Sequence, residues 1–235
     1  MSAIHCTGPA IPLLHVSAEM KVMAVHVVRY TPRTGSRTAR LLEHAIAQLD
    51  PAPVVTDLAT TLPPLFDTTR VDGYVARNYG GIEPAAETAA ALAPMDRYVE
   101  QLRAADRIIL ATPMYNFGLP AAVKAWFDAV IQRDRTWTVR DGAYEGWLTG
   151  HRALLITTSS GQYEDGPGSY DLLTPTVRQL FGFMGFAGVD VVAGQGTAAP
   201  AEVVDRRMAQ ARAEIDRVIA AWKSEAPTSR AQPAR

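Results

Sequence analysis

Cysteine is almost absent from this chain of 235 residues, in which Cys6 is the only one. A single cysteine excludes a disulfide within one chain and a metal site built from several thiolates. Because cytoplasmic proteins keep their thiols reduced, we expect the protein in the cytoplasm. The sequence also lacks an apolar run near the ~18 residues that a membrane-spanning helix needs, so no membrane span is predicted.

An excess of charge of either sign is missing as well. The chain has 23 basic and 24 acidic residues and no block of like charge. Nucleic acids and anionic membrane surfaces attract strongly basic patches. We therefore expect neither of them as a partner.

Several motifs of common enzyme classes are also lacking. The histidines are scattered without the spacing of metal ligands, at His5, His15, His26, His44 and His151, so no metal site is expected. No G-x-G-x-x-G follows the first apolar segment, which argues against tight dinucleotide binding. No G-x-S-x-G is present, which argues against an α/β-hydrolase. Redox chemistry would therefore require a bound cofactor.

What the sequence does contain is an alternation of apolar segments with helix-prone ones. The apolar segments are 21–29, 53–58, 108–111, 151–158 and 189–193. Residues 108–111 include no polar side chain, which is typical of a strand buried on both faces. The alternation predicts an α/β fold, a doubly wound three-layer sandwich around a five-stranded parallel sheet.

The length fits one domain, which we place at residues 21–223. Residues 1–20 include a mildly apolar part that Pro12 interrupts, and no basic segment precedes it, so a signal peptide is not expected. We expect them to be a disordered extension or an upstream start that is not used in the cell. The polar residues 224–235 predict a flexible tail.

The segment between the second and third strands is the hardest to interpret. Prolines and glycines interrupt residues 62–93, whereas 83–92 is rich in alanine and 96–105 has helical periodicity. A surface loop accounts for the interrupted part.

The central segment is 107–128, an apolar strand, a loop that contains Pro113-Met114-Tyr115-Asn116-Phe117-Gly118, and a helix announced by Pro120. Ligands of open α/β sheets bind at the carboxyl ends of the strands. The loop is therefore expected to present backbone N–H groups to a flat ligand.

Two further loops follow strands at the same edge of the sheet. In the first, Thr31, Ser36 and Thr38 precede or begin a helix, where N–H groups and the helix dipole favour a phosphate, and Arg33 or Arg37 would add charge. Ser36 is explained equally well as a plain N-cap. In the second, small residues from Thr158 to Gly161 could turn successive N–H groups towards an acceptor.

Residues 136–147 predict a β-hairpin, because Trp137 and Val139 alternate with threonines before an Asp141-Gly142 turn. Its aromatic side chains could cover a planar substrate, contact a second subunit or simply cap the core.

Pro113-Met114-Tyr115-Asn116-Phe117, followed by Lys124 and Phe127-Asp128, resembles the FMN-dependent NADH:quinone oxidoreductases, or FMN-dependent NADH-azoreductases, which have the flavodoxin-like fold. Thr31-Pro32-Arg33 with Ser36-x-Thr38 is similar to their phosphate loop. The resemblance covers nearly all of residues 21–222.

This resemblance implies strand order 2-1-3-4-5, a hairpin insertion after the third helix, and a homodimer to which residues 62–93 contribute. It further implies one FMN per subunit, NADH or NADPH as hydride donor, and a quinone or azo compound as acceptor in a two-step exchange. No side chain is assigned as catalytic, because flavin N5 is the reactive atom.

The cofactor-binding residues expected from the loops and the resemblance are Thr31, Ser36, Thr38, Pro113, Met114, Tyr115, Asn116, Phe117, Gly118, Thr158, Ser159, Ser160, Gly161 and Tyr163. Those expected to stack against the substrate are Tyr115, Phe117, Trp137 and Tyr163. One departure stands out, because Ser159 occupies the place of an arginine in the family's Ser-Arg-Gly-Gly pattern.

Two other functions fit the same fold. One is a flavodoxin-like electron carrier, and the other is an NAD(P)H-dependent FMN reductase that releases reduced flavin. Near-neutral charge and the hairpin favour the quinone or azo reductase over the carrier, since flavodoxins are usually acidic and lack this hairpin.

Overall fold

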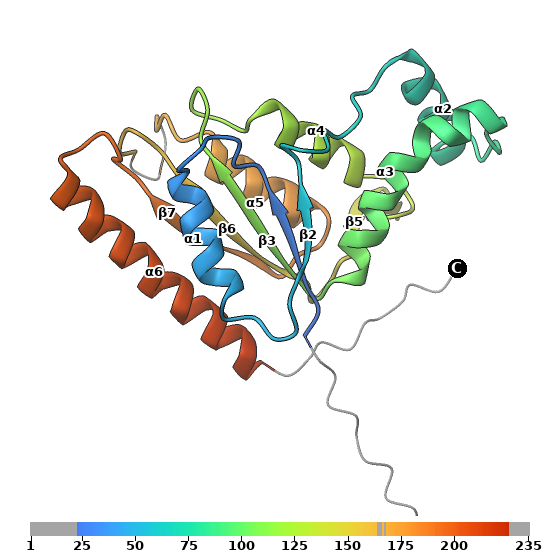
Figure 1. The fold of residues 1–235 in the computed structure, drawn as a ribbon. Coiled ribbons are helices and arrows are strands. Elements are labelled where there is room, and N and C mark those ends of the chain that lie inside the picture. Colours follow the sequence, from blue (N-terminus) through green and yellow to red (C-terminus); the bar gives the residue numbers. More distant parts are fainter. Residues whose placement is uncertain (1–22, 164–165, 167, 226–235) are drawn as a thin grey trace, which may run out of the picture.

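The computed structural model describes residues 23–163, 166 and 168–225. Five parallel strands form one sheet, in the order β2 (Val54–Asp57), β1 (Val25–Arg29), β3 (Arg107–Pro113), β6 (Arg152–Thr158) and β7 (Gly188–Gly194). Counted within this sheet, the order is 2-1-3-4-5, so the predicted fold is confirmed (Figure 1). The extension expected at residues 1–20 lies outside the described residues. Of the tail expected at 224–235, Ser224 is the last residue of α6, and the residues beyond 225 lie outside the described part of the chain.

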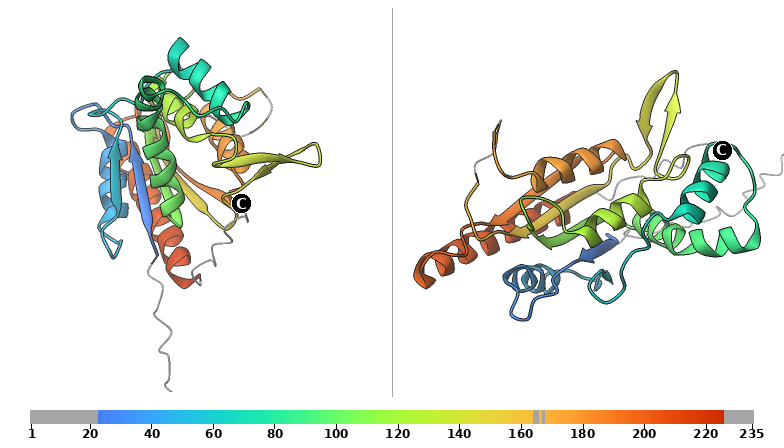
Figure 2. Two further views of the ribbon diagram at one scale, coloured as in Figure 1. Left: turned by 90° about the vertical axis from the view of Figure 1, so that its right-hand side faces the viewer. Right: turned by 90° about the horizontal axis from the view of Figure 1, so that it is seen from above.

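Helices cover both faces of the sheet (Figures 1 and 2). The layer on one face is α1 (Arg37–Ile46) and α6 (Ala201–Ser224), and the layer on the other is α3 (Ala86–Ala104), α4 (Ala121–Val130) and α5 (Leu173–Phe183). Alternate residues of β3 face the two layers, since Ile108 packs with α3, α4 and α5 and Ile109 with α1 and α6. This double burial explains the unbroken apolar run of the central strand.

The segment between β2 and β3 is more helical than the sequence predicts. It forms α2 (Thr68–Asn78) as well as α3, which runs unbroken through Pro94. Gly73 lies where α2 crosses α3, and a Cβ at this position would collide with Thr88. The glycine that resembles a helix breaker is therefore required for close packing of two helices.

The predicted hairpin is confirmed as β4 (Trp137–Arg140) and β5 (Ala143–Gly146). Asp141 and Gly142 both have positive φ, 51° and 80°, as the turn of a two-residue hairpin requires. The hairpin follows the helix after β3, as expected, but this helix is the fourth of the chain because α2 and α3 both precede it. Figure 2 shows the hairpin standing out from the sandwich.

The helices of the described part of the chain include none with the length and apolar character needed to cross a membrane.

Candidate active site

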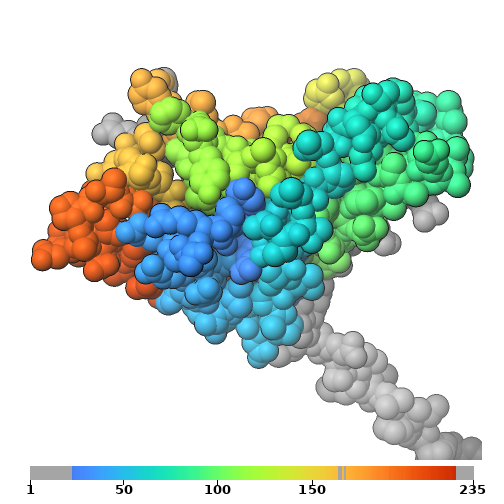
Figure 3. All heavy atoms as spheres, turned by 45° about the horizontal axis from the view of Figure 1, so that its top comes forward, coloured from blue at the N-terminus to red at the C-terminus, as the bar shows by residue number. Residues whose placement is uncertain are grey.

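Three loops at the carboxyl edge of the sheet surround one pocket. They follow β1, β3 and β6, and Figure 3 shows this face of the molecule with the loops in blue, green and amber around a hollow. The pocket has a volume of about 160 Å³ and is lined by Thr31, Pro32, Arg33, Ser36, Arg37, Thr38, Pro113, Tyr115, Thr158, Ser159, Ser160 and Thr197. This is smaller than a typical small-molecule site of roughly 300–1,000 Å³, so it suits one end of a larger ligand.

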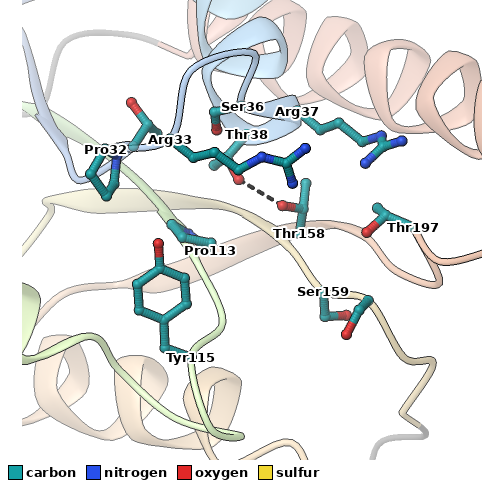
Figure 4. Close-up of a pocket in the computed structure, with 12 residues that line it drawn as sticks. Pro32, Arg33, Ser36, Arg37, Thr38, Pro113, Tyr115, Thr158, Ser159 and Thr197 are labelled. Atoms are coloured by element: carbon teal, nitrogen blue, oxygen red, sulfur yellow. Dashed lines mark hydrogen bonds between the residues drawn. The ribbon is translucent and has the colours of Figure 1, made fainter.

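The start of α1 forms the anion-binding end of the pocket. The Ser36 hydroxyl accepts from the Ala39 N–H at 3.2 Å, so Ser36 is the N-cap. The N–H groups of Arg37 and Thr38 have no acceptor among the described residues. Free N–H groups at the positive end of a helix dipole favour a phosphate there. Figure 4 shows the Arg33 side chain extending across the pocket, where it adds positive charge.

A buried hydrogen bond joins this helix to β6. The hydroxyl of Thr38 lies 2.7 Å from that of Thr158, and both side chains line the pocket. Thr38 is fully buried. The bond fixes the spacing between the phosphate end of the pocket and the loop that begins after Thr158.

The loop after β3 ends in a tight turn of four residues. Tyr115 and Gly118 exchange two backbone hydrogen bonds of 3.2 and 3.0 Å, while Asn116 and Phe117 have positive φ of 47° and 69°. Two successive residues with positive φ define a type I′ turn, which is costly for Phe. Strain of this kind is typical of functional sites, and the turn holds Asn116 at its tip.

The loop after β6 is held in place by backbone hydrogen bonds from the loop after β7. The carbonyl oxygens of Ser159, Ser160 and Gly161 accept from the N–H groups of residues 196–198 after β7. The N–H groups of Ser160 and Gly161 donate to no acceptor in the part of the chain that the structure describes. They form a pair of fixed donors for a ligand with acceptor atoms.

The turn and the β6 loop lie side by side. Met114 N–H donates to the Thr158 carbonyl at 3.0 Å, and the Phe117 ring lies 6.0 Å from that of Tyr163 in an edge-to-face contact. The Tyr163 side chain in turn covers Gly161, since a Cβ added to Gly161 would lie 2.7 Å from the Tyr163 hydroxyl. Flat apolar rings next to fixed donors suit a planar ligand with polar edges.

Trp137 lies apart from this group. Only 7% of it is exposed, and its ring contacts Phe183 at 5.1 Å and Tyr144 at 5.5 Å. The hairpin packs closely on the end of α5, where a Cβ on Gly146 would collide with the backbone of Gly185. Within one chain, then, Trp137 caps the core and does not line the pocket, whereas the exposed aromatic side chain of the hairpin is Tyr144.

Sequence reasoning missed three residues near the pocket. Thr197 lines it from the loop after β7, a position that neighbouring parallel strands would have indicated. The exposed Tyr170 ring lies 5.2 Å from Phe117. Arg207 of α6 donates to the Gly196 carbonyl at 2.9 Å and to the Gln162 side chain at 2.7 Å, so it braces the β6 loop.

The arrangement suits a ligand with a phosphate at one end and a flat ring that carries acceptor atoms at the other. Charged and dipolar groups of the protein are gathered at the phosphate end, and backbone donors and aromatic rings at the ring end. Over the described residues, no group of three or more His, Cys, Asp or Glu side chains is placed to hold a metal ion.

Comparisons with known proteins point in the same direction. A family described by its flavodoxin-like fold matches residues 23–219. The FMN-dependent NADH:quinone oxidoreductase of Shewanella baltica (strain OS223) is 36% identical over 151 residues, which cover 64% of this chain and 75% of the relative. A relative of the same name from Escherichia coli O139:H28 (strain E24377A / ETEC) is 34% identical over 167 residues, or 71% and 81% of the two chains.

Two solved structures share the fold. An azoreductase from Bacillus anthracis str. Sterne gives a TM-score of 0.75 at 20% identity, covering 83% of this chain and 98% of that one. An FMN-dependent NADH-azoreductase from Bacillus anthracis str. Ames Ancestor, solved in complex with FMN, gives 0.72 at 20% identity, with 83% and 99% covered.

Proposed function

Since the chain belongs to the flavodoxin-like-fold family that includes the FMN-dependent NADH:quinone oxidoreductases, we propose that it is an FMN-dependent oxidoreductase. In this proposal it passes hydride from NADH or NADPH through bound FMN to a quinone or an azo compound, in a two-step exchange within one pocket. One observation carries it: two pairs of N–H groups that have no acceptor among the described residues lie close to one pocket, those of Arg37 and Thr38 at the start of α1 and those of Ser160 and Gly161 in the loop after β6.

The FMN phosphate would lie at the start of α1. There the N–H groups of Arg37 and Thr38 would donate to its oxygens, and Arg33 would neutralise part of its charge. Ser36 keeps a hydroxyl proton to donate, because its oxygen acts as acceptor in the N-cap. Thr31 lines the same end of the pocket.

The ring would lie between the Asn116 turn and the β6 loop. The chemistry that bound FMN supplies is hydride acceptance and donation at N5. The N–H groups of Ser160 and Gly161 would donate to the ring edge that gains negative charge on reduction, which raises the reduction potential. Tyr115, Phe117 and Tyr163 would stack against the planar substrate, as 42% of Tyr115 and 44% of Phe117 are exposed.

We also propose that the enzyme is a homodimer and that the segment around α2 contributes to the interface. Apolar side chains are exposed along this segment, with 69% of Leu62 and 70% of Leu65 accessible, together with Val71, Val75 and Ile82. Exposed apolar patches of this kind mark interaction sites. Sedimentation of the FMN-loaded protein tests it, and a fully active monomer would contradict it.

A spectrum and one assay test the main proposal. The purified protein should stay yellow through gel filtration after reconstitution with FMN and should then oxidise NADH or NADPH steadily when a benzoquinone is present. A protein that retains no flavin would contradict the cofactor assignment. Retained flavin without steady oxidation would favour the electron carrier, and release of flavin on reduction would favour the FMN reductase.

A further inference from the structure

A second pocket lies beside the first, in the groove between α1 and α6. Its volume is about 200 Å³, and four charged side chains line it above an apolar floor: Arg37, Arg40, Asp205 and Arg212. The two helices are joined farther along, where Asp216 of α6 accepts hydrogen bonds from His44 of α1 and from Gln48, which follows α1.

The positive charge of this pocket is not neutralised within the part of the chain that the structure describes. None of the three arginines forms an ion pair with a carboxylate of the described residues. Over the described residues, the only side-chain hydrogen bond of these three arginines is the one that Arg40 donates to the Gly35 carbonyl at 3.3 Å. By contrast, Arg207, which lies on α6 like Arg212, donates side-chain hydrogen bonds to Gly196 and Gln162. Three guanidinium groups face one carboxylate, Asp205, so the pocket has a net positive charge.

Arg37 belongs to both pockets. In Figure 4 its side chain extends from the start of α1 towards α6, whereas that of Arg33 extends over Thr38 and Thr158. Its backbone N–H therefore serves the first pocket while its guanidinium reaches the second. An anion in the second pocket would be the immediate neighbour of the phosphate in the first.

We propose that the α1/α6 pocket binds a phosphoryl group, recognised by the guanidinium groups of Arg37, Arg40 and Arg212. Guanidinium groups match phosphate oxygens in geometry and charge. The volume lies below the roughly 300–1,000 Å³ of typical small-molecule sites, so the pocket takes a small anion or the end of a larger ligand. Two sources have this chemistry: a free phosphate compound, or the second phosphate of a dinucleotide flavin whose first phosphate lies in the neighbouring pocket.

The proposal rests on the first pocket being the FMN site, and the probe is chosen accordingly. Inorganic pyrophosphate is titrated calorimetrically into protein saturated with FMN, so that the first pocket is filled. We expect one binding event per chain, weakened about tenfold or more in Arg212→Ala and in Arg40→Ala, since a charged hydrogen bond is lost. Asp205→Asn should tighten binding, because it removes the repelling carboxylate.

Arg206→Ala is the matched control. Arg206 is an exposed arginine of α6 that does not line the pocket, so its loss should leave pyrophosphate binding unchanged. Absence of binding to the FMN-loaded protein, or binding that is the same in all four variants, would overturn the proposal.

Titration of the flavin-free protein with FMN and with FAD identifies the source. If Arg212→Ala weakens FAD binding and spares FMN, the ligand is the dinucleotide. If it spares both flavins and weakens pyrophosphate, the ligand is a free phosphate compound. Failure of the wild-type protein to bind FMN would contradict the proposed function instead, whereas intact FMN binding without a pyrophosphate site would contradict this inference alone.

Discussion

The hydroxyl groups of Thr38 and Thr158 lie 2.7 Å apart, although 120 residues separate them in the chain. Thr38 lies in the first turn of α1 and Thr158 ends β6, so this single bond couples the phosphate end of the pocket to the loop that carries Ser160 and Gly161. Both residues were expected at the site from sequence, but a contact between their side chains was not.

Thr38→Val should destabilise the protein by about 1–3 kcal/mol, because it leaves the buried Thr158 hydroxyl without a partner. FMN binding should weaken as well, whereas Thr38→Ser, which keeps the hydroxyl, should bind FMN nearly as the wild type does. The double variant Thr38→Val/Thr158→Val should cost less than the sum of the two single variants. Urea unfolding and flavin fluorescence titration measure these effects, and strict additivity would refute the coupling.

The turn at Asn116 should tolerate glycine and reject a β-branched residue. Asn116 has φ of 47°, which glycine adopts freely and valine does not. Asn116→Val should therefore cost about 1–3 kcal/mol of stability and weaken FMN binding. Asn116→Gly should keep the stability, so any affinity that it loses belongs to the amide side chain. Thermal unfolding and FMN titration of both variants are the measurements, and equal stability of the two would contradict the role of the turn.

Arg207 should act on the flavin through the β6 loop. Arg207→Ala removes the hydrogen bonds to Gly196 and Gln162, so we expect faster amide hydrogen exchange in residues 159–163 and FMN binding weakened several-fold. Arg206→Ala, the neighbouring exposed arginine, should change neither quantity. Weakened FMN binding with unchanged exchange in the loop would show that Arg207 acts in another way.

His26 should make the fold sensitive to acid. Burial lowers its pKa from 6.5, and a hydrogen bond with the backbone of Gln101 opposes this shift less strongly. The unfolded chain then binds a proton more readily than the folded one, so stability is present above pH 6.5 and is lost as the pH falls below it. Urea unfolding at pH 8, 6 and 5 should show this loss in the wild type and a smaller one in His26→Gln. Equal pH dependence in the two proteins would exclude His26 as the cause.

The sheet could be predicted from sequence because its signal is local. Ile108 and Ile109 face opposite helix layers, so an unbroken apolar run was required and was present. The helix α2 could not be predicted, because Gly73 serves a contact with Thr88 that only the folded chain creates. The same limit applies to Trp137, whose burial against Phe183 depends on how the hairpin packs on α5.

Part of the site could also be predicted from the sequence, for a different reason. Parallel strands end at one edge of the sheet, so the loops of Ser36, Asn116 and Gly161 were expected to meet there. Arg207 was not expected, because it contacts the loops from the second turn of a long helix whose apolar stripe indicates only core packing. Contacts between distant segments of this kind leave no pattern in the sequence.

The most direct test of the whole account is a crystal structure of the protein with FMN bound. We predict the phosphate within hydrogen-bonding distance of the N–H groups of Arg37 and Thr38, and the ring between the Asn116 turn and the N–H groups of Ser160 and Gly161. A flavin bound at another edge of the sheet, or a pocket in which Tyr115 and Tyr163 fill the space for the ring, would contradict it.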